Sequence, residues 1–514
     1  MRTIYLILFV CFLSGFTTAQ TDKSTAQKLD DYFTNLANGR EFNGNVLVAE
    51  NGKVVYEKSF GYADFEARKL NTKDTEFELA SIAKPFTATA VLQLKEKGKL
   101  NLDDKFIKYF PEFPYAEITV RHLLAHTSGL PDLDLFDKLV AENPDRIFEN
   151  KEVIPVMKAA KTPLRFQPGE KWSYNNFNYA LLALLVEKLS GQKFDDYLKK
   201  NVFEPARMTR TYVRTSLINA QPTPNLAFNY TYPFLFSSEL INVEKTFSNP
   251  FYKKTFYNHA FVGMSYVYST TGDMLKFDRA LYDAKLLKNE TLEEAFTPTK
   301  LNSGEMNKPA SRPGSLGFGG LGNSFNALGW FILEDAAAGK IVWHGGGMPG
   351  ILTIFLRNVT KKQTVIVFDN TMSPGLYRKG LSAMNILNGK PILTVKKSLA
   401  GIYGRTLIAK GVDSAAVRLN ELKADTENYS LSEDEFNNMA YDMMFNGFKE
   451  QALETFKINT FSFPTSDNVY ESYGDALLRA GKKEEAIIMF KKALKVNPDN
   501  KYAKKNLIKA ESEK

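Results

Sequence analysis

A serine and a lysine stand three residues apart in Ser81-Ile82-Ala83-Lys84, where a helix is expected to begin. This spacing places both side chains on one face of a helix, and a helix N-terminus favours negative charge that develops nearby. Pro85 suits the first turn, where a backbone donor has no partner. The pair could supply a nucleophile and its base. By itself, the pattern is more typical of a helix cap beside a solvated lysine, and Ser190-Gly191-Gln192-Lys193 repeats it in an expected loop.

Two other groups could complete a catalytic site. Tyr174-Asn175-Asn176 follows the turn-forming Gln167-Pro168-Gly169, so a phenol and an amide could meet the serine and lysine across a cleft. His344-Gly345-Gly346-Gly347 ends an expected strand, and glycines there would let a ligand approach the chain and reach its N–H groups. Each group also fits an ordinary role, as a buried tyrosine, a core histidine or a loose turn. Their joint presence, in this order, favours an active site.

Two histidines four residues apart, His122 and His126, could instead suggest a metal site. Zinc metalloproteases need glutamate directly after the first histidine, and Leu123 stands there. The chain has four histidines and one cysteine, so a cysteine-based zinc site is excluded. We expect no metal and no other cofactor.

The hydrophobic pattern predicts the elements that must position these groups. Residues 46–49 and 54–56 flank Asn51-Gly52, a strong signal for a two-residue hairpin. Apolar residues then recur at helical spacing over 86–94, and a second apolar helix spans 179–189. Strands at both ends with helices between them predict a mixed α/β (α+β) domain, whose antiparallel sheet joins the two ends and carries a helical subdomain. The late strands are expected at 328–333, 341–344, 351–356 and 364–369.

Residues 228–261 contain eleven Phe or Tyr among 34 positions. They could line an apolar substrate pocket. Such a cluster more often packs an inserted subdomain, and packing is the favoured interpretation. The loops at 228–261 and 314–325 are expected to shape the pocket, but their sequences do not indicate which substrate binds.

The C-terminal part contains an internal repeat of 34 residues, the spacing of the tetratricopeptide helix–turn–helix unit. Two such units at about 433–466 and 467–500, with a final helix from Lys501, predict an all-α tail. Residues 396–428 could be a degenerate earlier unit, although the register fails. Two repeats are fewer than such arrays need for independent stability, so the tail is expected to lean on the main domain. The repeated positions are Gly447, Ala452, Phe456 and Pro464, which recur as Gly481, Ala486, Phe490 and Pro498.

The N-terminus predicts export. Arg2 precedes an apolar stretch at 4–13, and small residues at 17–19 offer a cleavage site, so 1–19 is typical of a signal peptide. Ser14-Gly15 interrupts the stretch well short of the roughly 20 residues of a spanning helix. Cys11 lies inside the apolar run, which argues against a lipid anchor. We expect a secreted or periplasmic protein without a stable membrane span after cleavage.

The net positive charge of the chain comes largely from its C-terminal residues. The 514 residues carry a formal charge of +8, and residues 481–514 hold ten Lys against five Asp or Glu. No nucleic-acid partner is therefore expected. A composition of 44% hydrophobic and 24% charged residues excludes disordered and polytopic membrane classes.

Together, the three motifs resemble the serine β-lactamase and penicillin-binding-protein fold, in the branch of class C β-lactamases, D-alanyl-D-alanine carboxypeptidases and related esterases. The resemblance covers about residues 29–371. It includes the stretches at 118–130 and 166–170, and Ser269-Thr270-Thr271-Gly272-Asp273, which is similar to the start of the family's late helix.

The resemblance implies a serine hydrolase. Ser81 would form the acyl-enzyme, Lys84 would accept its proton, and Tyr174 would protonate the leaving group and help to activate water. Lys84 must be uncharged for this role, so burial has to lower its pKa from about 10.4 toward ~7–8. Asn176 would position Lys84 and the substrate, and the N–H groups of Ser81 and Gly347 would form the oxyanion hole.

The last motif departs from the dedicated β-lactamase pattern. His344 stands where many relatives carry lysine, facing a substrate carboxylate or Tyr174, and Gly345 lacks a hydroxyl. Both features weaken recognition of a substrate carboxylate, so generic esterase or peptidase activity is favoured, with little or slow turnover of penicillins.

These observations predict a signal peptide (1–19), a hydrolase domain (20–375), a partly helical connector (376–432) and the repeat tail (433–514). The predicted function is an exported hydrolase of an ester or amide, such as a D-peptide, a peptidoglycan-like molecule or a small ester. The alternative is a catalytically weak or silent cell-wall sensor whose tail docks a protein partner. A third hypothesis makes the tail the working part, although its Lys-rich face is more typical of a solvated helix surface.

Overall fold

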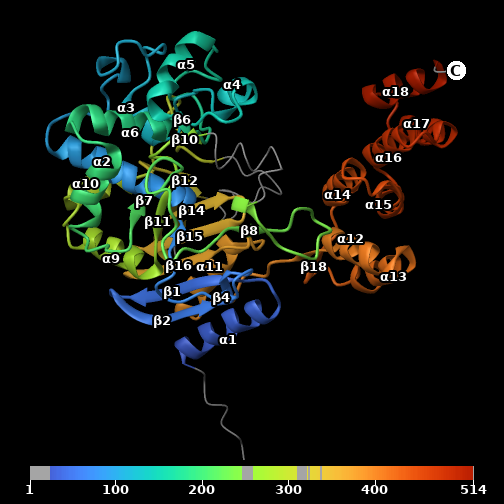
Figure 1. The fold of residues 1–514 in the computed structure, drawn as a ribbon, viewed down its shortest axis with the longest axis horizontal. Coiled ribbons are helices and arrows are strands. Elements are labelled where there is room, and N and C mark those ends of the chain that lie inside the picture. The colour runs from blue at the N-terminus through green and yellow to red at the C-terminus, as the bar shows by residue number, and fades with distance from the viewer. Residues whose placement is uncertain (1–23, 246–258, 310–320, 322–323, 336–337, 513–514) are drawn as a thin grey trace, which may run out of the picture.

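The computed structural model describes residues 24–245, 259–309, 321, 324–335 and 338–512, so the predicted signal peptide lies outside the described residues. Within them, a seven-stranded sheet forms the centre of the larger domain (Figure 1), in the order β12-β13-β14-β15-β16-β1-β2. All neighbours are antiparallel, and Val46 of β1 lies opposite Val367 of β16. The predicted mixed α/β fold, with a sheet that joins both ends, is confirmed. The strands are β1 (Gly44–Glu50), β2 (Lys53–Phe60), β12 (Ser324–Asn326), β13 (Phe331–Asp335), β14 (Gly339–Met348), β15 (Ile351–Asn358) and β16 (Gln363–Asp369).

Local sequence explains most strand limits. Asn51 and Gly52 both have positive φ, 50° and 71°, as a type I′ hairpin turn requires. The expected strand at 328–333 begins only at Phe331, because Gly329 has a φ of 82° and turns the chain before it.

The sheet separates two hydrophobic cores. On β1, Leu47 and Ala49 face one core, whereas Val46 and Val48 face the other. Because the central strands are buried on both faces, they read as continuous apolar runs. The first core is completed by α2 (Ala83–Glu96), α6 (Phe177–Ser190) and α9 (Thr271–Tyr282), and the second by α1 (Thr25–Asn38) and α11 (Leu376–Leu387).

Helix α11 packs on the sheet, so the hydrolase domain ends later in the sequence than expected. Its residues Leu376, Ala383 and Met384 are buried in the second core, against β15 and β16. The domain therefore extends beyond the predicted boundary at 375, because the sheet would otherwise expose an apolar face that α11 covers.

A buried ion pair links the sheet to its helical layer. Arg357 Nε on β15 lies 2.5 Å from Asp278 Oδ1 on α9, and the two side chains are 1% and 2% exposed. Thr364 on β16 donates to Asp278 Oδ2 at 2.6 Å. One carboxylate thus ties two neighbouring strands to α9.

The C-terminal part is helical and extends away from the sheet in Figure 1. Its helix pairs coincide with the predicted limits at 433–466 and 467–500. Gly474 lies so close to the Phe490 ring that a Cβ would come within 2.6 Å of it, which explains a small residue at this crossing. Assignment to the tetratricopeptide class stays a prediction. The helices are α12 (Leu399–Lys410), α13 (Val412–Leu422), α14 (Glu433–Phe445), α15 (Lys449–Ser462), α16 (Asp467–Arg479), α17 (Lys483–Val496) and α18 (Lys501–Ser512).

The aromatic segment from 228 onward reaches the tail. Phe236 is 4% exposed and packs in one core with Leu399 and Tyr403 of α12. Its ring lies 5.3 Å from that of Phe448, between α14 and α15. Arg405 of α12 donates to a backbone carbonyl of the same segment at 3.2 Å. The tail therefore contacts the hydrolase domain, as expected for so short an array.

Among the described helices, none combines the length and the apolar character needed to cross a bilayer.

Candidate active site

Ser81 lies in a tight turn between a short strand and the central helix. β5 (Phe77–Glu78) leads into η1 (Ala80–Ile82), which continues as α2. Ala80 has a φ of 47°, a left-handed conformation that costs a non-glycine residue roughly 1–2 kcal/mol. The turn therefore needs support from its surroundings.

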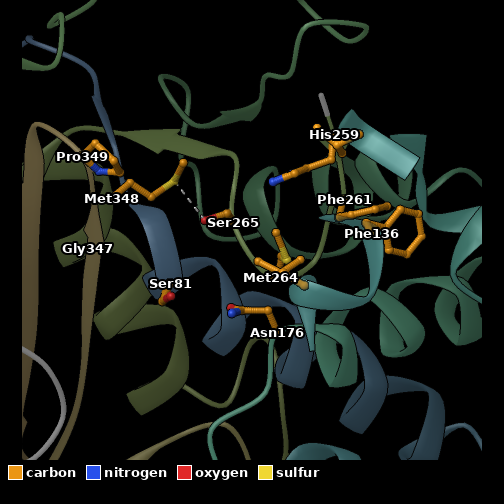
Figure 2. Close-up of a pocket in the computed structure, with 12 residues that line it drawn as sticks. Ser81, Phe136, Asn176, His259, Phe261, Met264, Ser265, Gly347, Met348 and Pro349 are labelled. Atoms are coloured by element: carbon orange, nitrogen blue, oxygen red, sulfur yellow. Dashed lines mark hydrogen bonds between the residues drawn. The ribbon is translucent and has the colours of Figure 1, made fainter. Parts of the chain in front are cut away.

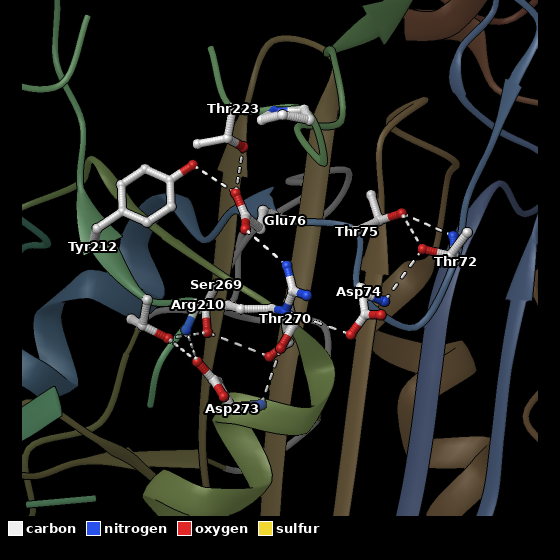
Figure 3. Close-up of polar contacts among 12 residues, drawn as sticks. Thr72, Asp74, Thr75, Glu76, Arg210, Tyr212, Thr223, Ser269, Thr270 and Asp273 are labelled. Carbon is white, nitrogen blue, oxygen red and sulfur yellow. Dashed lines mark hydrogen bonds and ion pairs between the residues drawn. The ribbon is translucent and has the colours of Figure 1, made fainter. Parts of the chain in front are cut away.

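A polar network holds the segment before Ser81 (Figure 3). The buried Glu76 carboxylate accepts hydrogen bonds from Tyr212 Oη at 2.9 Å and Thr223 Oγ1 at 2.5 Å. Arg210 lies 3.7 Å from Glu76, and its backbone N–H donates to Asp273 at 2.7 Å. Asp273 belongs to the motif 269–273, in which Thr270 caps α9 by accepting from the Asp273 N–H at 3.1 Å. The motif thus anchors the nucleophile turn and starts α9.

Lys84 lies one helical turn after Ser81 and is fully buried. Its Nζ is 3.1 Å from Ser81 Oγ, 3.1 Å from Asn176 Oδ1 and 2.8 Å from the Met264 carbonyl oxygen. Burial lowers the pKa of Lys84 from 10.5 to about 7, and the negative charge of Asp132 acts in the opposite direction. A neutral amine has two N–H donors and one lone pair. The carbonyl and the amide can accept the two donors, which leaves the lone pair for the Ser81 hydroxyl.

The Tyr174 hydroxyl is buried at the same point. Burial raises the pKa of Tyr174 well above its ordinary 10, and a hydrogen bond with Ser81 acts in the opposite direction. The phenol is therefore protonated at neutral pH. Lys84 Nζ lies 4.9 Å from the centroid of the Tyr174 ring.

His126 supports Tyr174, a role that the sequence did not reveal. The two rings stack with centroids 4.4 Å apart and planes at 28°. Burial lowers the pKa of His126 well below 6.5, so the ring is neutral, and its Nδ1 accepts from the Asn175 N–H at 3.1 Å. His122 instead accepts from the Thr119 N–H at 3.2 Å, inside a capping box of α3 (Val120–Leu124). Across the described ranges, no cluster of metal-ligating side chains is found.

Asp132 is a further site residue that sequence reasoning missed. Its Oδ1 accepts from the N–H groups of Asn176 at 3.0 Å and Phe177 at 3.4 Å, and so caps α6 from another segment. Its Oδ2 lies 3.4 Å from Asn176 Nδ2. This contact turns the amide oxygen of Asn176 toward Lys84. The one local signal is that Asp132 stands two residues after the stretch 118–130. A cap supplied from 44 residues away has no sequence pattern.

The three glycines on β14 have different roles. A Cβ on Gly345 would lie 2.4 Å from the Tyr377 ring, and one on Gly346 would lie 2.2 Å from the Leu79 carbonyl oxygen. Close packing therefore requires both, in place of the expected ligand approach. Gly347 is exposed and lines the cavity. Pairing of β14 with β13 ends at Trp343, so 344–348 continue beyond that neighbour, beside the Ser81 turn.

His344 does not supply a positive charge. It is 1% exposed, and burial lowers its pKa to about 3, with repulsion from Lys84 as a second cause. Its Nδ1 lies 2.7 Å from the Gly345 carbonyl oxygen, and its ring lies 5.3 Å from that of Phe331. A neutral imidazole in this position gives a substrate carboxylate no ionic partner.

A cavity of about 230 Å³ opens over Ser81 and Asn176 (Figure 2). Met348 and Pro349 lie on one side of it, and Phe136, Phe261 and His259 lie on the other. The aromatic segment at 228–261 therefore has two roles: Phe261 lines the cavity, Phe236 packs against the tail, and 246–258 lie outside the described residues. The full lining is Ser81, Leu133, Phe136, Val140, Asn176, His259, Phe261, Met264, Ser265, Gly347, Met348 and Pro349.

A serine hydroxyl, a buried amine and a protonated phenol meet beside an antiparallel sheet that helices flank, an arrangement typical of serine hydrolases of the β-lactamase fold. The model of the Beta-lactamase family matches residues 29–386, and the chain belongs to this family. Its members include hydrolases of amides and esters, and this chain is a serine hydrolase.

Two relatives from Bacillus subtilis (strain 168) are similar in sequence. Penicillin-binding protein 4* is 33% identical over 366 residues, which cover 71% of this chain and 76% of that protein. The putative penicillin-binding protein PbpX is 30% identical over 59% of this chain and 70% of its own length.

Solved structures agree in fold. The octameric penicillin-binding protein homologue from Pyrococcus abyssi is 26% identical, with a TM-score of 0.57 over 71% of this chain and 78% of its own. D-amino acid amidase from Ochrobactrum anthropi SV3 shares the fold at 22% identity, with a TM-score of 0.55 over 71% of this chain and 97% of its own.

Proposed function

We propose that the chain is an exported hydrolase that cleaves an ester or amide through an acyl-enzyme on Ser81. The observation that carries this proposal is the 3.1 Å distance between Lys84 Nζ and Ser81 Oγ, together with burial that lowers the pKa of Lys84 to about 7. A general base must lie near the proton that it accepts, here that of the Ser81 hydroxyl, and must be partly deprotonated at the working pH. Lys84 meets both conditions.

In the first step, the Ser81 oxygen attacks the substrate carbonyl carbon and its proton moves to Lys84 Nζ. The new C–O bond places a negative charge on the carbonyl oxygen. The N–H groups of Ser81 and Gly347 would stabilise this charge, where one donor contributes about 10²–10³ in rate. Residues 344–348 continue beyond the pairing with β13 and lie beside the Ser81 turn, which supports this assignment.

In the second step, the bond to the leaving group breaks and Tyr174 Oη gives its proton to the departing nitrogen or oxygen. Lys84 then returns its proton to Tyr174. Water then attacks the acyl carbon while Tyr174 and Lys84 accept its proton, and the bond to Ser81 breaks as the serine oxygen takes the proton back. Asn176 holds Lys84 in place throughout. The raised pKa of Tyr174 supports its role as an acid, because the proton is present at neutral pH.

The substrate proposal favours esters and amides without an ionised carboxylate, such as small esters or D-amino-acid amides and peptides. The neutral state of His344 supports this choice. So does the name of the D-amino acid amidase that shares the fold, because an amino acid amide carries no carboxylate. We expect penicillins to be turned over slowly, and efficient hydrolysis of benzylpenicillin would contradict the proposal.

Export is the cellular part of the proposal, and it depends on the signal-like residues 1–19. N-terminal sequencing of protein recovered from the periplasm or the medium tests it. A chain that begins near Gln20 would support export, and a chain that keeps Met1 in the cytoplasm would contradict it.

The activity is tested by hydrolysis of a short-chain p-nitrophenyl ester by the purified protein beside Ser81→Ala. Turnover that the variant abolishes supports the acyl-enzyme. Equal, negligible rates in both proteins would favour the alternative of a silent sensor with a docking tail. Near-ultraviolet circular dichroism of both proteins controls for folding.

A further inference from the structure

The cavity beside Ser81 has an apolar wall, which consists of Leu133, Phe136, Val140, Phe261 and Met264. Seen from Ser81, Phe136 and Phe261 lie beyond Asn176 (Figure 2). A group attached to the carbonyl carbon and directed over Asn176 would therefore meet this wall.

The wall is rigid before any substrate arrives. The Phe136 ring lies 5.1 Å from Phe261, 5.4 Å from Phe148 and 5.4 Å from Phe177, and Phe136 is only 3% exposed. Side chains fixed in this way lose little conformational freedom when a ligand binds. The apolar surface is thus preorganised.

The same segment is tied to the catalytic lysine. The Met264 carbonyl accepts from Lys84 Nζ at 2.8 Å, and the Gly263 carbonyl accepts from Thr87 Oγ1 at 2.7 Å. Asn150 closes the other end, because its side chain bonds both the N–H and the carbonyl of Val262 at 2.9 Å. The position of Met264 relative to Ser81 is therefore set by hydrogen bonds between this segment and α2.

The wall lies apart from the path of the leaving group. Tyr174 packs against the second core, with Trp172, and is not among the residues that line the cavity. Phe136, Val140, Phe261 and Met264 belong to the other core. A leaving group must reach Tyr174 for its proton, so the group that meets the wall is the acyl part of the substrate.

The lining of the cavity disfavours ionised acyl groups. Among the described residues that line the cavity, none is Lys, Arg, Asp or Glu. The titratable side chain at the rim, His259, has its Nδ1 3.0 Å from Tyr266 Oη. An ionised acyl group would lose its hydration here without an ionic partner, which is costly.

We propose that this wall is an acyl-binding subsite for a bulky, uncharged apolar group of about the size of a phenyl ring or a six-carbon chain. A cavity of about 150 Å³ can hold benzene, so about 230 Å³ accommodates such a group together with the scissile carbonyl. This inference rests on the proposed acyl-enzyme at Ser81.

The test measures kcat/KM of the full-length protein for p-nitrophenyl acetate, butyrate, hexanoate, phenylacetate and hemisuccinate. Each buried methylene is expected to raise kcat/KM about fourfold, so hexanoate should exceed acetate by about 10²-fold. Phenylacetate should behave like hexanoate, and the charged hemisuccinate should fall below butyrate. Equal rates from acetate to hexanoate, or a preference for hemisuccinate, would overturn the inference.

Val140→Phe provides a direct test of the wall, because Val140 lies at its edge on α4 (Asp137–Glu142) and is 9% exposed. The larger ring should fill the subsite and lower the hexanoate-to-acetate ratio of kcat/KM about tenfold or more. Leu139→Phe is the matched control, since Leu139 is on the same helix but does not line the cavity, and it should keep the wild-type ratio. Loss of both substrates in equal proportion in Val140→Phe would overturn the subsite.

The outcomes separate the two proposals. Acetate turnover that depends on Ser81 but shows no acyl preference contradicts the subsite alone. Absence of Ser81-dependent turnover with every ester contradicts the proposed function and the subsite together. If Val140→Phe does not fold, Val140→Thr replaces it. This variant keeps the volume, and its hydroxyl should reduce the hexanoate-to-acetate ratio of kcat/KM.

Discussion

The pKa of Lys84 predicts the pH dependence of the enzyme. The difference between an ordinary lysine pKa of 10.5 and about 7 corresponds to about 5 kcal/mol against the charged form. At pH 7 about half of Lys84 is uncharged, against roughly one part in 3,000 for an ordinary lysine. Since the neutral amine is the proposed base, kcat/KM should rise about tenfold per pH unit below pH ~7 and reach a plateau above it.

The assay is kcat/KM for p-nitrophenyl butyrate between about pH 5 and pH 9, with Ser81→Ala as the blank for spontaneous hydrolysis. The neutral histidines of the site cannot produce this rise in kcat/KM, the acidic limb of the profile, because burial lowers the pKa of His344 to about 3 and that of His126 well below 6.5. Glu78 can mimic it, since burial raises the pKa of this carboxyl to about 7.

Two variants decide between the groups. Glu78→Gln should keep the limb if it belongs to Lys84 and remove it if it belongs to Glu78. Asp132→Asn should move the limb to lower pH, because Asp132 stabilises the charged amine. A profile that is flat from pH 5 to pH 9, or a limb that Glu78→Gln abolishes, would refute the assignment of Lys84 as the base.

Three further predictions follow from the described contacts. Tyr174→Phe should lower kcat by about 10²–10⁴ with little change in the urea midpoint, and wild-type kcat would show that no phenolic proton is needed. Arg357→Met should lower the free energy of unfolding by about 3–5 kcal/mol in urea titrations, because it leaves Asp278 buried without its partner; the exposed Arg418→Met is the control and should change it by less than about 1 kcal/mol. Phe236→Ala should lower the thermal midpoint of the tail by removing a ring from its contact with α12, while ester turnover persists; loss of both together would show that the two domains unfold as one unit.

Local chemistry made much of the fold predictable. Asn51-Gly52 turns a hairpin because both residues accept positive φ, and the spacing of Ser81 and Lys84 places them on one helical face. The apolar runs at 351–356 and 364–369 predict strands that are buried on both faces. Each of these features depends on residues within a few positions of one another.

The errors arose where distant segments decide the outcome. The domain boundary at 375 was set too early, because burial of α11 depends on β15 and β16. Gly345 and Gly346 were interpreted as openings for a ligand, whereas Tyr377 and Leu79 crowd them. His126 was weighed as a metal ligand and as part of the stretch 118–130, but its stacking on Tyr174 was not foreseen, because it joins residues far apart in the chain.

By itself, the sequence determined which groups are available: a hydroxyl, an amine, a phenol and an amide, each on an element whose type follows from local propensity and periodicity. The tertiary structure decided their chemical state. Lys84 is partly uncharged at neutral pH only because Met264, Asn176 and the rings of Tyr174 and Tyr179 enclose it, and exclusion of water lowers its pKa to about 7. Desolvation depends on everything that surrounds a group in space, and neighbours in the chain supply only a small part of those surroundings.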